Sequence, residues 1–251
     1  EIPNVSLVSG KALQVLKYDY NQEQLKIKLG KKFPAGQSYT VFIDYTAKPD
    51  ELKTKGSAAI TDAKGLYFIN PDGSDKNKPV QIWTQGETEA SSVWFPTIDK
   101  PNQKTTSEIS ITVPAKYVTL SNGKLATQIK GTDGTRTDTW KMDLPHAPYL
   151  FMMAVGDFKV YKDKWKEKEV SYYLEPAYAP YAKSIFGVTP EMMTFFSNKV
   201  GIDYPWNKYS QIVVRDFVSG AMENTTATLH GEFVQQTDRE LIDEYFGQGE
   251  S

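Results

Sequence analysis

The segment Asp157–Lys168, with the sequence DFKVYKDKWKEK, separates two different sequence patterns. In the residues before it, apolar and polar side chains alternate, which is the period of a strand with one face in water. In the residues after it, apolar side chains also recur at helical spacing. Because the segment is densely charged, we interpret it as an interruption of the β pattern. We therefore predict a mostly β fold, with a β-domain over residues 1–157 and an α+β part over residues 158–251.

Two antiparallel hairpins are predicted in the first part. Leu25–Leu29 and Tyr39–Tyr45 both alternate, and the stretch between them contains the Gly and Pro of a turn. Leu125–Lys130 and Arg136–Met142 form the second pair, joined across Asp133-Gly134. Asp-Gly favours the positive φ angles of a tight hairpin turn, which supports the second hairpin. In both pairs, the two segments are expected to form adjacent antiparallel strands.

The second part contains one well-marked helix between two strands. The strands are predicted at Val170–Leu174 and Gln211–Val214. Thr189 is suited to be the N-cap of the helix, and Gly201 is suited to end it. The helix carries an apolar stripe of Met192, Phe195, Phe196 and Val200. A second helix is predicted at Thr237–Tyr245, where the capping-box pattern Thr-x-x-Glu occurs.

The composition is that of a folded chain without an overall basic field. Of the 251 residues, 39% are hydrophobic and 24% are charged, which supplies enough apolar surface for a core. Lys and Arg number 29, and Asp and Glu number 31, so we expect no nucleic-acid partner. There is no cysteine, which excludes disulfides and thiolate metal sites.

The sequence gives no sign of a membrane span or of a particular compartment. No stretch approaches the roughly 18–20 consecutive apolar residues of a transmembrane helix, so no integral membrane segment is expected. The N-terminus has neither a signal-peptide pattern nor an initiator Met. We therefore expect the sequence to begin inside a longer gene product or after a removed leader. The cytoplasm and a bacterial periplasm fit equally well.

Common catalytic motifs are missing from the sequence. The two histidines, His146 and His230, are far apart in the chain, so no H-E-x-x-H metal-binding helix is present. There is no G-x-S-x-G elbow and no G-x-x-x-x-G-K-[ST] phosphate loop. His146 fits a turn, and His230 fits a polar strand or loop residue more simply than a metal ligand.

Two carboxylates, Glu87 and Glu223, lie in segments that invite a functional interpretation. The simplest interpretation is that both are ordinary solvated acids. However, Glu223 follows Gly220 and Ala221, and small residues allow another backbone to approach closely, as when a peptide adds to a sheet as an extra strand. A carboxylate at the end of such a strand is suited to hold a cation, for example the α-ammonium group of a peptide.

Gly220–Asn224 reads GAMEN, which is the signature of the aminopeptidase N family of zinc metallopeptidases. Other segments resemble this family in the same order, namely Thr84–Glu87 (TQGE), Phe95–Pro101 (FPTIDKP), Ile109–Asn122 (ISITVPAKYVTLSN), Tyr149-Leu150 and Val155–Phe158 (VGDF). The resemblance covers most of the chain, from about Leu25 to Asn224. It departs from the family at Thr225–Thr228, where a Trp-Gly pair is frequent, which affects the expected wall of a pocket.

The resemblance implies a particular domain organisation and cofactor. Residues 1–157 are expected to be most of the family's β-sandwich or saddle-like N-terminal domain, without its first strands. Residues 158–251 are expected to be the start of a thermolysin-like catalytic domain. In the family, the zinc-binding H-E-x-x-H helix follows the signature by roughly thirty residues, which places it after Ser251. The resemblance therefore implies a zinc aminopeptidase whose catalytic residues and zinc ligands lie outside this chain, so that the fragment alone is inactive.

The resemblance also implies which residues bind substrate. Glu223 and Glu87 are expected to hold the α-ammonium group of a peptide with a free N-terminus, and Gln85 is expected to lie beside them. The full set of expected substrate-binding residues is Gln85, Glu87, Gly220, Ala221, Met222, Glu223 and Asn224. Anchoring of the N-terminus would restrict cleavage to the first peptide bond.

One alternative belongs to a different functional class. The chain fits a non-catalytic β-domain scaffold or a peptide-binding module in a protein that carries out no peptidase chemistry. An H-E-x-x-H motif downstream of Ser251 would distinguish the two hypotheses, because a relative without zinc ligands would look the same over these 251 residues.

Overall fold

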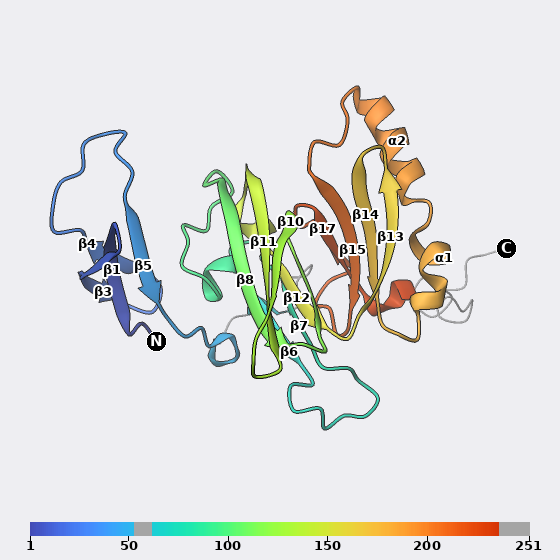
Figure 1. Ribbon diagram of the computed structural model, residues 1–251, viewed down its shortest axis with the longest axis horizontal. Helices are drawn as coiled ribbons and strands as arrows, with labels where there is room; N and C mark the ends of the chain where they lie inside the picture. The colour runs from blue at the N-terminus through green and yellow to red at the C-terminus, as the bar shows by residue number, and fades with distance from the viewer. Residues whose placement is uncertain (53–61, 236–251) are drawn as a thin grey trace. The chain divides into compact units, whose positions relative to one another are not determined.

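The computed structural model describes residues 1–52 and 62–235 (Figure 1). The chain forms two compact units, Glu1–Lys48 and Pro49–Ser251, which are treated separately below. The helix predicted at Thr237–Tyr245 lies outside the described residues. Within the described ranges, no helix has the length and apolar character needed to cross a membrane.

The first unit consists of two small antiparallel sheets. Their strands are ordered β2-β1-β5 and β3-β4, with β1 at Asn4–Ser9, β2 at Ala12–Val15, β3 at Lys17–Tyr20, β4 at Leu25–Lys28 and β5 at Thr40–Asp44. The predicted strands β4 and β5 exist, but the predicted hairpin between them is wrong. β4 pairs with β3 and β5 pairs with β1. The buried side chains of Val5 and Leu7 on β1 provide the apolar partners for Val41 and Ile43, so β1 takes the place beside β5.

The second unit begins with two further antiparallel sheets. One has the order β6-β7-β12-β9, with strands at Leu66–Ile69, Gln81–Thr84, Met153–Gly156 and Val118–Ser121. The other has the order β10-β11-β8, with strands at Lys124–Lys130, Thr135–His146 and Thr105–Pro114. The predicted hairpin of β10 and β11 is confirmed, and Gly134 in its turn has a φ of +81°. This left-handed conformation is one that glycine adopts without strain.

A five-stranded mixed sheet follows. Its order is β13-β14-β15-β17-β16, with strands at Lys159–Trp165, Lys168–Leu174, Lys208–Val214, Ala227–Gly231 and Ala221–Met222. The prediction that Asp157–Lys168 interrupts the β pattern is wrong, because β13 occupies most of this segment. β13 lies at the edge of the sheet and pairs only with β14. Most of its side chains are exposed, so a highly charged sequence is compatible with a strand there.

The α-helices of the described chain precede β15, whereas short 3-10 turns occur along its length. The α-helices are α1 (Ala182–Phe186) and α2 (Thr189–Val200), and short 3-10 turns occur at Pro49–Glu51, Ser91–Val93, Pro148–Leu150, Ala179–Tyr181 and Glu232–Gln235. The prediction of α2 is confirmed, and Gly201 ends it with a φ of +77°. Its predicted N-cap is wrong by one residue. Val188 occupies the N-cap, and the Thr189 hydroxyl instead donates to Gln211 Oε1 at 2.7 Å.

The five-stranded sheet is covered on both faces. In Figure 1, α1 and α2 lie beside β13 and β14, on the side away from β8, β10 and β11. Tyr172 and Leu174 of β14 pack with Phe186 of α1 on one face. Tyr173 and Ile212 point the other way and share a core with Trp83, Leu120 and Ala154 of the preceding sheets. A strand that is buried on both faces is typical of a central strand in a mixed sheet.

This architecture confirms the predicted fold class, a mostly β chain with an α+β part in its second half. The strands before residue 157 belong to different sheets from those after it, which supports a boundary near residue 158. The hydrophobic core continues across that position, and the two compact units divide at residue 48. The boundary between residues 157 and 158 therefore stays a prediction.

Candidate amine-binding site

The first half of the candidate site is the segment that follows β7. Gln85 is buried, and its backbone N–H donates to the carbonyl of Gly65 at 2.9 Å. Gly86 packs against the backbone of Tyr149, since a Cβ atom on it would lie 2.3 Å from the Tyr149 carbonyl oxygen. Glycine is therefore required here for close backbone approach. The next side chain, Glu87, is half-buried.

The second half of the site is the signature segment at the edge of the five-stranded sheet. β16 pairs antiparallel with β17, with Ala221 opposite His230 and Met222 opposite Leu229. Met222 is buried, whereas Ala221 and Glu223 are exposed. The sheet order places β16 at the outer edge, so no further strand of the described chain covers its other side. Such an edge is where an extended peptide can add by main-chain hydrogen bonding.

The two halves meet at Tyr149. Burial raises the pKa of the Tyr149 hydroxyl, and the negative charges of Glu223 and Glu87 raise it further, because each carboxylate opposes the formation of a phenolate. Both carboxylates therefore lie within electrostatic reach of the same hydroxyl, although they are far apart in the sequence. That the two acids share one ligand stays a prediction.

Two amide side chains of the predicted set are buried without a hydrogen-bond partner among the described residues. Gln85 and Asn224 are 1% and 2% exposed, and neither the nitrogen nor the oxygen of either amide is paired. An unpaired buried amide costs about 1–3 kcal/mol, so such groups are normally satisfied by a ligand or by water. These amides therefore add unused hydrogen-bonding capacity to the two segments that carry the acids.

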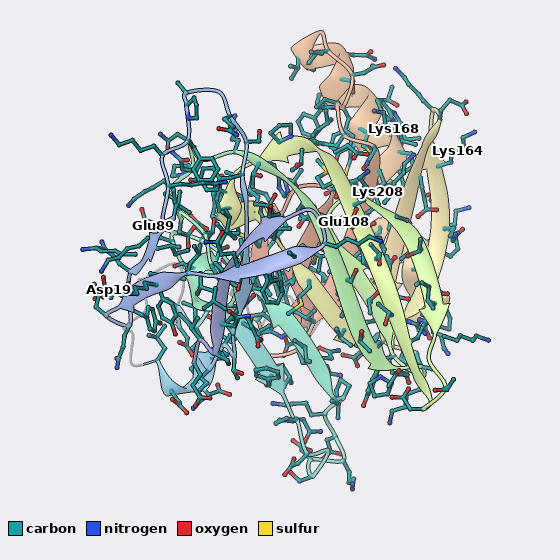
Figure 2. The ribbon with its side chains drawn as sticks, turned by 60° about the vertical axis from the view of Figure 1, so that its left-hand side comes forward. Asp19, Glu89, Glu108, Lys164, Lys168 and Lys208 are labelled. Atoms are coloured by element: carbon teal, nitrogen blue, oxygen red, sulfur yellow. The ribbon has the colours of Figure 1, made fainter. Side chains whose placement is uncertain are left out.

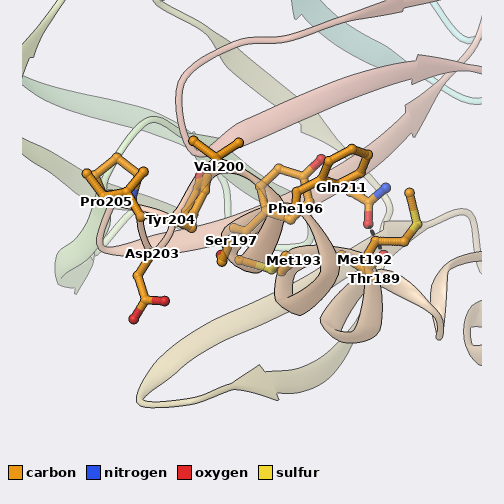
Figure 3. A pocket seen from close by; sticks show the side chains of 12 residues that line it. Thr189, Met192, Met193, Phe196, Ser197, Val200, Asp203, Tyr204, Pro205 and Gln211 are labelled. Atoms are coloured by element: carbon orange, nitrogen blue, oxygen red, sulfur yellow. Dashed lines mark hydrogen bonds between the residues drawn. The ribbon is translucent and has the colours of Figure 1, made fainter.

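A groove opens beside the start of the signature. It is lined by Asp216, Phe217, Ser219, Gly220, Gly231, Glu232 and Phe233. A separate, more apolar groove of about 410 Å³ lies along α2 (Figure 3), where Met192, Phe196 and Val200 contribute side chains. None of the predicted substrate-binding residues lines the groove along α2. Of the predicted substrate-binding residues, Gly220 alone lines the first groove. We therefore centre the candidate site on the edge strand β16 and on the Gln85–Glu87 segment, not on either groove.

The described residues do not fit a zinc ion. Over residues 1–52 and 62–235, no three His, Asp or Glu side chains converge as metal ligands. His146 ends β11 and stacks on Phe151 with ring centroids 4.3 Å apart. His230 lies in β17, near Phe186 and Gln211. Burial lowers the pKa of each histidine to about 4, which is the effect of an apolar environment.

Sequence reasoning did not find three residues that connect the two halves. Tyr149 interacts electrostatically with both carboxylates, and the side chains of Asn122 and Lys208 bind the backbone directly after the signature. Asn122 and Tyr149 belong to segments that resemble the family, but a hydrogen bond from a side chain to a distant carbonyl leaves no periodic pattern in a sequence. Lys208 reads as an ordinary charged residue before a strand.

Comparison with known proteins identifies the family of the chain. The Peptidase M1 N-terminal domain model matches residues 4–150, and the Peptidase family M1 domain model matches residues 185–241. Both matches define the same class of protein, a peptidase in which a separate N-terminal domain precedes the peptidase domain. The chain belongs to peptidase family M1. The predicted resemblance to the aminopeptidase family is thereby confirmed.

Curated relatives and a solved structure extend the comparison. The chain is 27% identical to endoplasmic reticulum aminopeptidase 1 of Mus musculus over 93% of its own length and 24% of the relative's. It is 32% identical to glutamyl aminopeptidase of Homo sapiens over 52% of its length and 14% of the relative's. The fold is similar to Legionella pneumophila aminopeptidase A in complex with aspartic acid, with a TM-score of 0.69 and 22% identity over 90% of this chain and 25% of that one. The chain therefore spans a quarter or less of the length of these proteins.

Proposed function

We propose that this chain carries the substrate-anchoring part of an aminopeptidase, in which Glu223 and Glu87 bind the α-ammonium group of a peptide. Two observations support this proposal: Gly86, next to Glu87, packs on the backbone of Tyr149, and, besides burial, the charges of Glu223 and Glu87 raise the pKa of the Tyr149 hydroxyl. Two nearby acids favour a cationic ligand, because each would be stabilised by the same positive charge. The unpaired amides of Gln85 and Asn224 supply further polar groups.

The edge strand gives the proposal a direction for the bound peptide. A peptide that pairs with the free side of Ala221–Met222 would extend along β16 and bring its first residue to Glu223. An ammonium group has three N–H donors, which two carboxylates satisfy better than one. Fixing the ammonium group in this way determines which peptide bond can reach the catalytic groups, so we propose exopeptidase action on the first bond.

We propose that the intact protein is zinc-dependent and that its zinc ligands lie outside this chain. A zinc ion in such an enzyme supplies polarisation of the scissile carbonyl and an activated water molecule. The described residues bind and orient the substrate and are assigned no step at the metal. The polypeptide of residues 1–251 should then bind no stoichiometric zinc and hydrolyse no aminoacyl anilide. Hydrolysis by this polypeptide would contradict the assignment, and a zinc-free full-length protein that binds peptides would favour a non-catalytic binding module.

The anchoring role is tested by replacing one carboxylate in the full-length protein. Glu223→Gln keeps the shape and removes the charge, so the charge-assisted bond to the ammonium group is lost. A hydrogen bond to a charged group contributes about 1.5–3 kcal/mol, so kcat/KM for aminoacyl substrates should fall roughly 10- to 100-fold. The control is Glu108→Gln, which neutralises an exposed acid on β8. Equal kcat/KM for Glu223→Gln and the wild type would refute the anchoring role.

A further inference from the structure

The turn between β9 and β10 connects the two halves of the candidate site through one side chain. Asn122 is 1% exposed, and its Nδ2 donates to the carbonyl of Leu150 at 2.9 Å and to the carbonyl of Thr225 at 2.6 Å. Its Oδ1 accepts the backbone N–H of Met152 at 2.8 Å. One buried amide therefore binds the chain next to Tyr149 and the chain just after Glu223.

Thr226, just after the signature, is held by two further side-chain bonds, and a third bond ties Lys208, which makes one of them, to Ser121. The Gly123 N–H donates to Thr226 Oγ1 at 2.8 Å. The Nζ atom of the buried Lys208 (Figure 2) donates to the carbonyl of Thr226 at 3.0 Å and to that of Ser121 at 3.1 Å. Thr226 has a φ of +68°, a conformation that is costly for a β-branched residue unless its surroundings fix it. These bonds provide that fixation.

On the other side, the chain around Tyr149 is fixed to the segment that carries Glu87. Ser91 Oγ donates to the carbonyl of Pro148 at 2.9 Å, and the Met153 N–H donates to Thr84 Oγ1 at 3.1 Å. Together with the close packing of Gly86 on Tyr149, these contacts fix residues 148–153 against residues 84–91. A continuous path of hydrogen bonds therefore runs from the Glu87 segment through Asn122 to the residues after Glu223.

We propose that Asn122 is a positioning residue that fixes Glu223 relative to Glu87 and thereby sets the affinity for a free α-amine. This inference rests on the proposed function, because it concerns the same two carboxylates. Asparagine suits the role because it offers two N–H donors and one acceptor, and all three contacts are to backbone groups. Aspartate at this position would lose both donors and set a negative charge against two carbonyl oxygens.

The proposal predicts a specific loss of amine recognition. Binding of leucinol, which carries a free amine, is compared by calorimetry in the full-length protein with binding of 4-methylpentan-1-ol, which lacks it. Asn122→Ala should weaken leucinol binding about tenfold or more, and it should change binding of the alcohol less than twofold. Thr226→Val removes the hydrogen bond from the Gly123 N–H without changing the side-chain shape. It should also weaken leucinol binding selectively, but by less than Asn122→Ala does. Thr226→Ser keeps the hydroxyl and should restore the wild-type ratio.

Thr119→Val is the matched control for lost stability. Thr119 is buried on β9, and its hydroxyl contacts only Asp138 and Trp140 within the preceding sheets. This variant should be destabilised but should keep the wild-type ratio of the two affinities. If Thr119→Val lowers the ratio of leucinol affinity to alcohol affinity as much as Asn122→Ala does, the proposal is wrong. It is also wrong if Asn122→Ala and Thr226→Val both fold and both keep the wild-type ratio. If Asn122→Ala does not fold, the comparison of Thr226→Val with Thr226→Ser decides.

The anchoring proposal and the positioning proposal fail in different ways. If Glu223→Gln leaves the affinity ratio unchanged, the anchoring role is wrong and Asn122 has no acids to position. If Glu223→Gln lowers the ratio but the Asn122 and Thr226 variants do not, the anchoring role stands and only the positioning role is wrong.

Discussion

At the scale of single residues, the site depends on polar groups whose environment differs from that of ordinary surface side chains. Burial, and then the charges of Glu223 and Glu87, raise the pKa of Tyr149, and Gln85 and Asn224 are buried with amide groups that have no partner among the described residues. Protein interiors rarely leave such groups unpaired. A ligand with a positive charge and several N–H donors would satisfy the acids and contribute donors to the amide oxygens.

The buried histidines predict how stability depends on pH. Burial lowers the pKa of His146 and of His230 to about 4, whereas an unfolded histidine has a pKa near 6.5. Below pH 6.5 the unfolded state therefore binds protons that the folded state does not, and stability falls until the pH reaches about 4. The loss approaches about 1.4 kcal/mol per pH unit for each histidine.

His146→Phe tests this prediction, because it keeps a ring against Phe151 and removes the titration. Urea unfolding at several pH values between 4 and 6.5 should give a shallower decline in the free energy of unfolding for the variant than for the wild type. Parallel declines would show that His146 does not contribute to the acid sensitivity.

At the scale of elements, the two helices differ in how they use their aromatic residues. Phe186 on α1 is 6% exposed and packs into the core of the five-stranded sheet. Phe196 on α2 is 57% exposed, and the other side chains of the predicted apolar stripe, Met192, Phe195 and Val200, are also exposed. The helical period was therefore predicted correctly, but within the described chain this stripe is not buried.

This difference predicts unequal effects of the same substitution in the polypeptide of residues 1–251. Phe186→Ala should lower the free energy of unfolding by about 3 kcal/mol or more, because it leaves a cavity in a packed core. Phe196→Ala should change it by less than about 1 kcal/mol, because little buried area is lost. Chemical denaturation of both variants measures the difference. An equal cost would show that the stripe on α2 is covered in solution.

At the scale of the whole molecule, local signals predicted more of the structure than non-local ones. The hairpin of β10 and β11 was predictable because Asp133-Gly134 determines its turn locally. The pairing of β4 with β5 was predicted wrongly because β4 forms a local hairpin with the preceding strand β3, and β5 pairs instead with the distant strand β1. β13 was missed because an edge strand tolerates a charged sequence that resembles a loop.

The candidate site was predictable only in part, for a similar reason. Glu87 and Glu223 were identified from segments that resemble a family, and the charges of both affect the pKa of Tyr149, which burial raises first. Neither acid stands out by periodicity or composition. The contacts of Asn122 join positions about thirty and one hundred residues apart, and such contacts become visible only when the chain is folded.

The central claim is that Glu87 and Glu223 bind the same ammonium group, and a double-mutant cycle tests it most directly. Leucinol affinity is measured by calorimetry for the full-length wild type, Glu87→Gln, Glu223→Gln and the double variant. If both acids share one ligand, each single change should weaken binding about tenfold, and the two effects should be non-additive by at least about 0.5 kcal/mol. Binding of 4-methylpentan-1-ol should stay unchanged. Additive effects, or equal losses for both ligands, would contradict a shared amine site.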